Sequence, residues 1–330
     1  MNELYPLKFA PQFYNKPWGG NNISKIKSLQ AAPAEQCGEA WLLSGVEGHI
    51  SVVENGFLKG NELNELIEVY MEDLVGENVF EKYGNVFPIL IKILDTTDWL
   101  SVQVHPDNKL ALKNHNVPFG KTEMWYIINT GKDAELINGL KKTSNAAKIK
   151  EAIEKGTIAQ ELNMIKPAEQ DVFFTPAGKI HAVGPGLTLA EIQQTSDFTY
   201  RLFDWNRKDK NGKARELHIE AGLEAINYED DTTGKTEPVA IDENIYKLVS
   251  CSEFVTNKIT LKASEILNCE YYTFDSFIIL LCVSGDAEYE WNNKKESLNM
   301  GECVLVPAMC DDITLISKSG ADILEVYIQG

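Results

Sequence analysis

The chain has 330 residues, of which 44% are hydrophobic and 24% are charged, and its formal net charge at pH 7 is -18. This length is enough for two domains with cores of their own, no apolar run reaches the ~18 residues needed to cross a bilayer, and the polar start of the chain is unlike a signal peptide, so we expect a cytoplasmic protein. The negative charge argues against nucleic acid or a membrane as a partner, although a local basic cluster could still bind a small anion.

The first hundred residues are predicted to contain a turn, a short strand and an amphipathic helix. Residues 17–20 are rich in Pro and Gly, which indicates a turn, and residues 38–45 have the pattern of a strand closed by a turn. Between Gly60 and Gly84 apolar residues recur at helical spacing, which predicts a single helix that covers a sheet. These residues are Leu63, Leu66, Ile67, Tyr70, Met71 and Leu74.

Polar and apolar residues then alternate along a predicted strand at residues 101–105. Ser101, Gln103 and His105 alternate with apolar neighbours, and a strand places alternate residues on one face. Lys121 and Glu123 precede the apolar run at 124–128 in the same alternating way. Two neighbouring strands would therefore bring a hydroxyl, an amide, an imidazole, an ammonium and a carboxylate into one space.

Two later segments add further polar groups. Residues 171–181 have the pattern of a strand followed by a Pro/Gly turn that delivers His181. The segment 187–205 is dense in polar and aromatic residues and contains Glu191 and Arg201. The intervening residues 141–165 break the β pattern and have the spacing of one or two helices.

The ligand chemistry of these side chains suits a divalent metal ion. Imidazole nitrogens with carboxylate and amide oxygens form a donor set that fits zinc or a similar ion, and three or four protein ligands with one open position are typical of a catalytic site. A single histidine on a strand is more often a structural residue. The metal hypothesis therefore depends on Gln103, His105, Glu123 and His181 together.

A repeat relates the two halves of the chain. Residues 131–135 resemble 285–288, each preceded by an apolar strand, and residues 171–176 match 302–307. The first copy is longer by about the length of the helical piece at 141–165. We therefore predict a mainly β protein with two cupin-like antiparallel β-barrels, or jelly rolls, and small helical insertions.

The predicted domain boundary follows from this repeat. The first domain is residues 1–230, with insertions at about 60–84 and 141–165, and the second is residues 231–330, after an acidic, turn-rich linker. The residue that corresponds to His181 in the second copy is Asp312, and no histidine follows His218. The second barrel is therefore expected to have lost its metal ligands.

These motifs resemble those of the type I mannose-6-phosphate isomerases in their short bacterial form, a family of the cupin superfamily. The resemblance covers roughly residues 17–207. It is carried by Gly38-Glu39-Ala40-Trp41, Ser101-Val102-Gln103-Val104-His105-Pro106, Gly120-Lys121-Thr122-Glu123-Met124-Trp125-Tyr126, residues 176–181, Glu191-Ile192-Gln193-Gln194, Thr199-Tyr200-Arg201 and Asp204-Trp205.

The resemblance implies an enzyme that interconverts mannose 6-phosphate and fructose 6-phosphate with one zinc ion per chain. It assigns the zinc to Gln103, His105, Glu123 and His181, catalytic or substrate roles to Lys121, Glu191 and Arg201, and phosphate contacts to Ser101 and Arg207. The implied partner is a small phosphorylated sugar, and we expect a monomer or a weak homodimer.

The chemistry of such an isomerisation assigns more specific roles. A proton must move between adjacent carbons through an enediol, which requires a base, an electrophile near the two oxygens and an anchor for the phosphate. We favour Glu191 as the proton carrier, with Lys121 as the competing candidate, and Arg201 as the stabiliser of negative charge. Two other classes stay open: a metal-dependent cupin oxygenase and a non-catalytic sugar-phosphate-binding protein.

Overall fold

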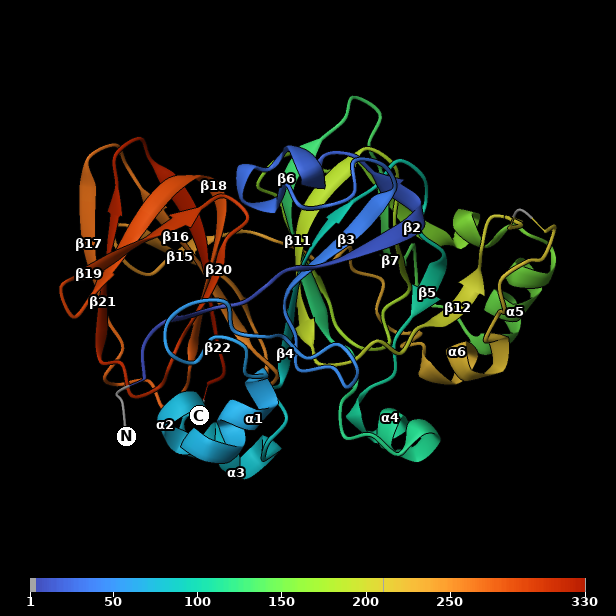
Figure 1. Ribbon diagram of the computed structural model, residues 1–330. Helices are drawn as coiled ribbons and strands as arrows, with labels where there is room; N and C mark the ends of the chain where they lie inside the picture. Colours follow the sequence, from blue (N-terminus) through green and yellow to red (C-terminus); the bar gives the residue numbers. More distant parts are fainter. Residues whose placement is uncertain (1–3, 210, 330) are drawn as a thin grey trace.

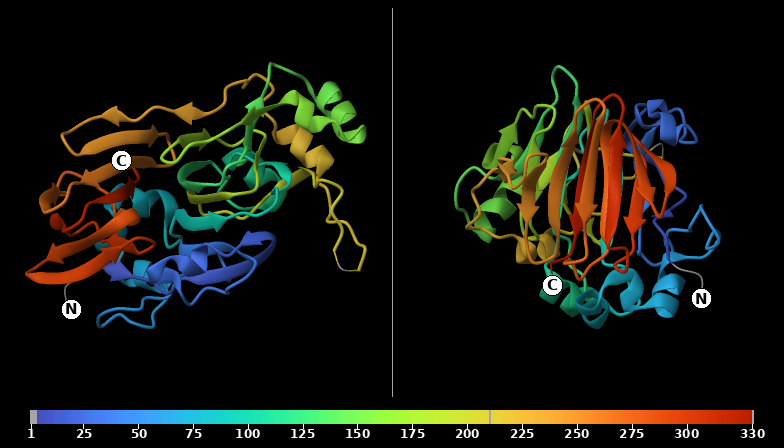
Figure 2. Two further views of the ribbon diagram at one scale, coloured as in Figure 1. Left: turned by 90° about the horizontal axis from the view of Figure 1, so that it is seen from above. Right: turned by 90° about the vertical axis from the view of Figure 1, so that its left-hand side faces the viewer.

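The computed structural model describes residues 4–209 and 211–329, and its strands form antiparallel sheets in two adjacent units (Figure 1). The predicted mainly β architecture is confirmed. Short helices lie at the ends and edges of the sheets, and none in the described part of the chain has both the length and the apolar character of a membrane span. Figure 2 shows the two units side by side, with α5 and α6 at the end remote from the C-terminal unit.

The N-terminal unit contains two sheets. The first has the strand order β13 (Lys235–Thr236), β9 (Val172–Thr175), β6 (Glu123–Thr130), β11 (Leu187–Gln194), β4 (Ile89–Asp95), β3 (Cys37–Leu43) and β2 (Gln12–Gly20). The second has the order β12 (Tyr200–Phe203), β5 (Val102–Val104), β10 (His181–Val183), β7 (Leu136–Leu140) and β8 (Leu162–Ile165). Among residues 4–209 and 211–329 no ladder joins these two sheets, so the expected barrel is open in its hydrogen bonding.

The C-terminal unit repeats the strand order of the seven-stranded sheet, but its ladders join all its strands into one ten-stranded sheet. Its main path runs β1 (Leu7–Lys8), β20 (Cys303–Val306), β18 (Ile278–Trp291), β22 (Ala321–Tyr327), β16 (Val255–Leu261), β15 (Ile245–Ser250) and β14 (Val239–Ala240). The second half of the long strand β18 pairs instead with β19 (Lys294–Asn299) and β21 (Asp312–Ser317), and β21 pairs with β17 (Glu265–Glu270). Each strand on the main path has a counterpart in the N-terminal sheet at the same place in the order.

One strand of each seven-stranded path comes from a distant part of the chain. β1, at the start of the chain, pairs with β20 of the C-terminal unit, and β13, in the predicted linker, pairs with β9 of the N-terminal unit. The next strand, β14, already belongs to the C-terminal sheet. These pairs interlock the two predicted domains, whose division at residue 230 stays a prediction.

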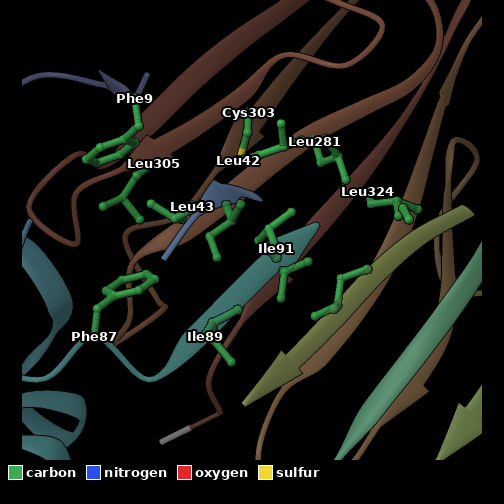
Figure 3. Packing of buried hydrophobic residues seen from close by; sticks show 14 of the residues in the cluster. Phe9, Leu42, Leu43, Phe87, Ile89, Ile91, Leu281, Cys303, Leu305 and Leu324 are labelled. Carbon is green, nitrogen blue, oxygen red and sulfur yellow. The ribbon is translucent and has the colours of Figure 1, made fainter. Parts of the chain in front are cut away.

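A shared hydrophobic core joins the two units, and strand periodicity explains how. Ile89 and Ile91 of β4 lie in one buried cluster with Leu281, Leu305 and Leu324 of the C-terminal sheet (Figure 3). The alternate residues of the same strand face the other sheet of the N-terminal unit, because successive side chains of a strand point to opposite faces. This second face carries the candidate site.

The segment 60–84 is helical, but the prediction of a single helix over a sheet is wrong. It forms α1 (Leu63–Tyr70), α2 (Glu72–Val75) and α3 (Glu77–Tyr83), which break at Met71 (φ 47°) and Gly76 (φ 94°). A Cβ on Gly76 would lie 2.6 Å from the backbone of Asp275, whose carboxylate accepts hydrogen bonds from the N–H groups of Glu77 and Asn78. The helices therefore pack against the end of the C-terminal unit.

Two smaller predictions also need correction. The Pro/Gly-rich residues 17–20 do not form a turn, because they continue strand β2. The insertion at 141–165 contains α5 (Ala146–Glu154) and a 3-10 turn at Ile158–Glu161, but its last residues form strand β8. The remaining helices are α4 (Asn108–His115), α6 (Ile219–Ala225) and two 3-10 turns at Ile23–Lys25 and Lys27–Leu29.

Candidate active site

The central strands of the two N-terminal sheets position the candidate site. Gln103 of β5 lies directly opposite His181 of β10 on one side and Arg201 of β12 on the other. In the facing sheet, Glu191 of β11 lies opposite Lys92 of β4. The predicted residues thus come from strands far apart in the sequence and meet between the sheets.

Three of the four predicted metal ligands form a buried cluster. His105, Glu123 and His181 are at most 1% exposed, and their candidate ligand atoms all lie within 4.8 Å of one another. His181 Nε2 is 3.3 Å from Glu123 Oε1, and His105 Nε2 is 3.5 Å from Glu123 Oε2. Ligands of a tetrahedral zinc ion are separated by roughly 3.3–3.6 Å, so this spacing fits a divalent ion.

The backbone hydrogen bonds of the two histidines involve Nδ1, and both Nε2 atoms lie toward Glu123. The carbonyl of Phe198 accepts a hydrogen bond from His105 Nδ1 at 2.8 Å, and the carbonyl of Lys179 accepts one from His181 Nδ1 at 2.9 Å. Such backbone partners fix the tautomer of metal-binding histidines. His181 Nε2 and Glu123 Oε1 are buried and have no hydrogen-bond partner among the described residues. This is the state expected of ligand atoms aimed at an ion.

Lys121 contacts this cluster directly. Its Nζ donates a short hydrogen bond to Glu123 Oε2 and lies 3.1 Å from His105 Nε2. Burial opposes the charge on Lys121, but the carboxylates of Glu123 and Glu191 outweigh it and raise the pKa of the ammonium group above its usual value. The ligand set therefore attracts positive charge.

Burial governs the protonation of the three candidate ligands. It lowers the pKa of His105 well below its usual value, and it lowers the pKa of His181 to about 3, with Lys121 adding to both effects. Burial also raises the pKa of Glu123 to about 7, although Lys121 opposes this shift. Both imidazoles are thus neutral at pH 7, which is the form that binds metals.

A cavity of about 160 Å³ opens beside the cluster. Five predicted site residues line it: Ser101, Gln103, Lys121, Glu191 and Arg201. Arg207 is not among the residues that line this cavity. Its guanidinium donates to Asp204 Oδ1 at 2.6 Å and to the carbonyl of Trp99.

Arg215 lines the cavity where the sequence prediction had placed Arg207. Its Nε and Nη2 donate to the two oxygens of Asp204 at 2.8 and 2.5 Å. Arg201 is adjacent, with its Nη1 donating to the carbonyl of Glu216 and its Nε buried without a partner among the described residues. The Asp204 carboxylate thus holds two guanidinium groups beside that of Arg201, and two further carboxylates are present, because Asp98 also pairs with Arg207 and Asp197 lines the cavity.

Sequence reasoning missed the charges on the opposite wall. Lys92 Nζ is 3.1 Å from Glu191 Oε1 and donates to Gln193 Oε1 at 2.7 Å, and it lies 4.9 Å from the ring centroid of Trp41. Glu39, in turn, accepts a hydrogen bond from Trp41 Nε1 at 2.7 Å. The sequence does contain a signal for this pair. Lys92 is the charged residue within the apolar run 89–94, and a buried strand rarely carries an unpaired charge.

Comparisons with known proteins agree with this geometry. Residues 6–119 match the profile of a family described as phosphomannose isomerase type I, catalytic domain. The mannose-6-phosphate isomerase of Streptococcus mutans is 42% identical over 221 residues, which cover 67% of this chain and 67% of that protein. The mannose-6-phosphate isomerase ManA of Bacillus subtilis is 35% identical over 309 residues, which cover 92% of this chain and 93% of that protein.

Solved structures show the same architecture. The crystal structure of the mannose 6-phosphate isomerase from Bacillus subtilis superposes on this chain with a TM-score of 0.87 and 30% sequence identity, covering 98% of this chain and 100% of the other. The apo form of the mannose 6-phosphate isomerase from Salmonella typhimurium shares the fold, with a TM-score of 0.78 at 16% identity.

Proposed function

The chain belongs to the type I phosphomannose isomerase family, and on this premise we propose that it interconverts mannose 6-phosphate and fructose 6-phosphate. The observation that carries the proposal is the buried cluster of His105, Glu123 and His181, which opens through Lys121 onto a cavity with a carboxylate on one wall and arginines at one end. The oxygenase alternative does not require these charged groups.

We propose that Gln103, His105, Glu123 and His181 hold one zinc ion. Gln103 is half-buried, lies opposite His181 in the sheet and lines the cavity, which supports its assignment as the fourth ligand. A bound zinc ion would supply Lewis-acid polarisation near the two substrate oxygens that exchange the carbonyl.

Glu191 is our proposed proton carrier between C1 and C2. Burial alone would raise its pKa, but Lys92 and Lys121 outweigh this effect and lower the pKa to about 2, so the carboxylate is ionised and can accept a proton. Lys92 and Trp125 each hold one of its oxygens, at 3.1 and 3.0 Å, which fixes the orientation of the base. Fixed orientation favours proton transfer in the bound complex.

Lys121 and Arg201 would balance the negative charge of the enediolate. The ammonium of Lys121 lies in the cavity beside the ligand cluster and can donate to a substrate oxygen, and Lys121 also remains the alternative proton carrier. Arg201 keeps its charge at any relevant pH and offers its unpartnered Nε.

We propose that the phosphate binds at the arginine end of the cavity. Ser101 offers a buried hydroxyl there, and the guanidinium of Arg215 lines the same space. Arg207 would act through Asp204, because that carboxylate binds Arg207 and Arg215 together. A cytoplasmic monomer or weak homodimer stays part of this proposal.

The test combines metal analysis with an assay of fructose 6-phosphate formation. We expect one equivalent of zinc, loss of activity on chelation with recovery on zinc addition, and neither bound zinc nor activity in His105→Ala. His49→Ala, a change outside the cluster, is the matched control and should retain both. A wild type that binds zinc without isomerising mannose 6-phosphate would reject the proposal in favour of a binding protein.

A further inference from the structure

A second cavity, of about 470 Å³, shares Asp197 with the substrate cavity but is otherwise formed by different residues. We propose that it binds a small neutral or cationic molecule with an apolar body and a hydrogen-bond donor, and that its occupancy is coupled to the metal site through residues 195–199. The segments that form it lie near α1 and α4, at the lower edge of the N-terminal unit in Figure 1.

The walls of this cavity are mainly apolar. The lining includes Val46, Ile50, Val86, Val117, Phe119 and Phe198. Five separate segments contribute to it, among them the turn after β3, the first turn of α1 and the loop between β11 and β12. A cavity of this size with a few convergent polar groups is the usual form of a small-molecule site.

Two polar atoms in the wall are buried without a partner. Ser196 is 4% exposed, and its Oγ has no hydrogen-bond partner among the described residues. The buried Oδ1 of Asn64 also lacks a hydrogen-bond partner there. The Ser196 backbone is fixed, because its carbonyl accepts a hydrogen bond from Gln193 Nε2 at 2.6 Å. Leaving such atoms unsatisfied is costly, so a ligand that donates to Asn64 Oδ1 and exchanges a hydrogen bond with Ser196 Oγ would relieve that cost.

The charges at this cavity exclude the sugar phosphate. Glu47 and Asp197 are the charged residues of the lining, and no Lys or Arg lines it among the residues that the structure describes. Both carboxylates are exposed, at the rim. An anionic ligand would be repelled there, whereas an alcohol or an amine with an apolar body would be accepted.

Phe198 connects the cavity to the metal cluster. Phe198 lines the cavity, and its carbonyl accepts the hydrogen bond from His105 Nδ1. Its ring stacks on His115, with centroids 4.1 Å apart and an interplanar angle of 16°. A ligand packed on Phe198 would therefore act on the residue that orients His105. This coupling rests on the proposed role of His105 as a metal ligand.

Binding is tested first, on zinc-loaded protein without sugar phosphate. Benzyl alcohol is the probe and benzoate, with the same ring, is the anionic control, and both are titrated by ligand-observed NMR. We expect saturable binding of benzyl alcohol in the millimolar range and at least about 10-fold weaker binding of benzoate. Equal binding of the two, or no saturation by the alcohol, would overturn the proposal.

Two variants locate the probe. Val117→Trp fills the cavity and Asn64→Leu removes the acceptor, and each should weaken binding about 10-fold or more. The exposed Val69→Trp and Asn78→Leu carry the same changes outside the cavity and should bind as the wild type does. The two cavity variants act by different means, so a folding defect in one, detected by its melting temperature, leaves the other decisive. Unchanged affinity in a folded cavity variant would overturn the site.

The coupling is tested by competition for zinc with a chromophoric chelator. Saturating benzyl alcohol should change the zinc affinity of the wild type about 5-fold and leave that of Val117→Trp unchanged. The same zinc affinity with and without the alcohol would overturn the coupling. Because neither measurement uses isomerase activity, a protein that binds the probe but lacks activity would count against the proposed function alone.

Discussion

Lys92 organises the charges on one wall of the substrate cavity. It lies on a strand whose other face is packed into the core shared by the two units, and its ammonium is held among Glu191, Gln193 and the ring of Trp41. A lysine this deeply buried is stable only because these partners replace its hydration. Its partnership with Glu191 therefore sets the charge state of the proposed base.

Replacing Lys92 should shift the pH dependence of the reaction. Lys92 lowers the pKa of Glu191, so activity is lost only as the pH falls through that low value. In Lys92→Met the pKa of Glu191 rises, and the acidic limb of the kcat/KM profile should move to higher pH, with kcat at pH 7 reduced about 10- to 100-fold. The exposed Lys25→Met is the control. An unmoved acidic limb would contradict the assignment of Glu191.

Arg215 and Arg207 make different predictions although both bind Asp204. Arg215→Gln should raise KM for mannose 6-phosphate about 10-fold and leave the rate with unphosphorylated mannose unchanged, because a charge-assisted contact with the phosphate is lost. Arg207→Gln should mainly lower the melting temperature, since its guanidinium donates to Asp204 and the Trp99 carbonyl. Steady-state kinetics with both sugars separates the two, and the reverse result would return the phosphate contact to Arg207.

At the level of elements, strand periodicity predicted most of the site. The alternation at 101–105 correctly predicted that Gln103 lies on a strand, β5, and that His105 follows at its end. The prediction succeeded because few other structures share the pattern of a strand with one buried polar face. The Pro/Gly turn before His181 was equally informative. The pairing of β5 with both β10 and β12 could not be read from the sequence, because register between distant strands depends on the packing of the whole sheet.

The helical segment shows a different limit. Its apolar spacing from Leu63 to Leu74 runs across Met71 without a visible break, so local pattern alone predicts one helix over these residues. Tertiary contacts surround the break at Gly76: the Val75 carbonyl accepts a hydrogen bond from Phe277 N, and Asp275 caps the start of α3. These contacts join residues that are about 200 positions apart in the sequence, and they outweigh the local preference for a continuous helix.

The repeat places a second buried carboxylate, Glu325, at the position in the C-terminal sheet that corresponds to Glu191. Glu325 of β22 lies between Leu280 of β18 and Asn257 of β16, as Glu191 of β11 lies between Trp125 and Lys92. Asn257 donates to Glu325 at 2.8 Å and Tyr271 donates at 2.9 Å, so neutral groups replace the lysine and the indole. The second unit keeps the carboxylate without the cation.

Glu325→Gln should stabilise the protein at neutral pH. Burial raises the pKa of Glu325, although hydrogen bonds from Asn257 and Tyr271 oppose the shift. The folded state thus binds its proton more tightly than the unfolded state, and stability is lost as the pH rises from the usual glutamate range through the raised pKa. Glutamine removes this loss, so urea denaturation should show a gain of about 1 kcal/mol at pH 8 and none at pH 4. A gain that is equal at both values would refute the charge argument.

For the whole molecule, the two units share one hydrophobic core and are interlocked by β1. The main hydrophobic cluster includes residues from both, and β1 completes the edge of the C-terminal sheet with Leu7 opposite Leu305. The repeat in the sequence predicted two similar units, but it gave no indication that the first residues of the chain pair with the second unit. A two-residue strand has too little pattern to be recognised.

Leu7→Ala tests this interlock. Leu7 is fully buried, so its truncation should reduce the free energy of unfolding by about 2–5 kcal/mol. Leu112→Ala, at a leucine that is 55% exposed, should change it by less than about 0.5 kcal/mol. Urea denaturation followed by circular dichroism provides both free energies of unfolding. A loss of stability in Leu7→Ala no larger than that in Leu112→Ala would show that β1 does not stabilise the fold.

The pairing of β1 also fixes an order of events during synthesis. Leu7 leaves the ribosome long before Leu305 of its partner strand β20. At about 5–20 residues per second, its side chain waits for roughly 15–60 s. During that time the apolar side chain of Leu7 lacks its partner strand, and a chaperone can bind it. A polypeptide truncated before residue 303 lacks that strand permanently. The edge of the C-terminal sheet that β1 forms therefore closes only after β20 has been made.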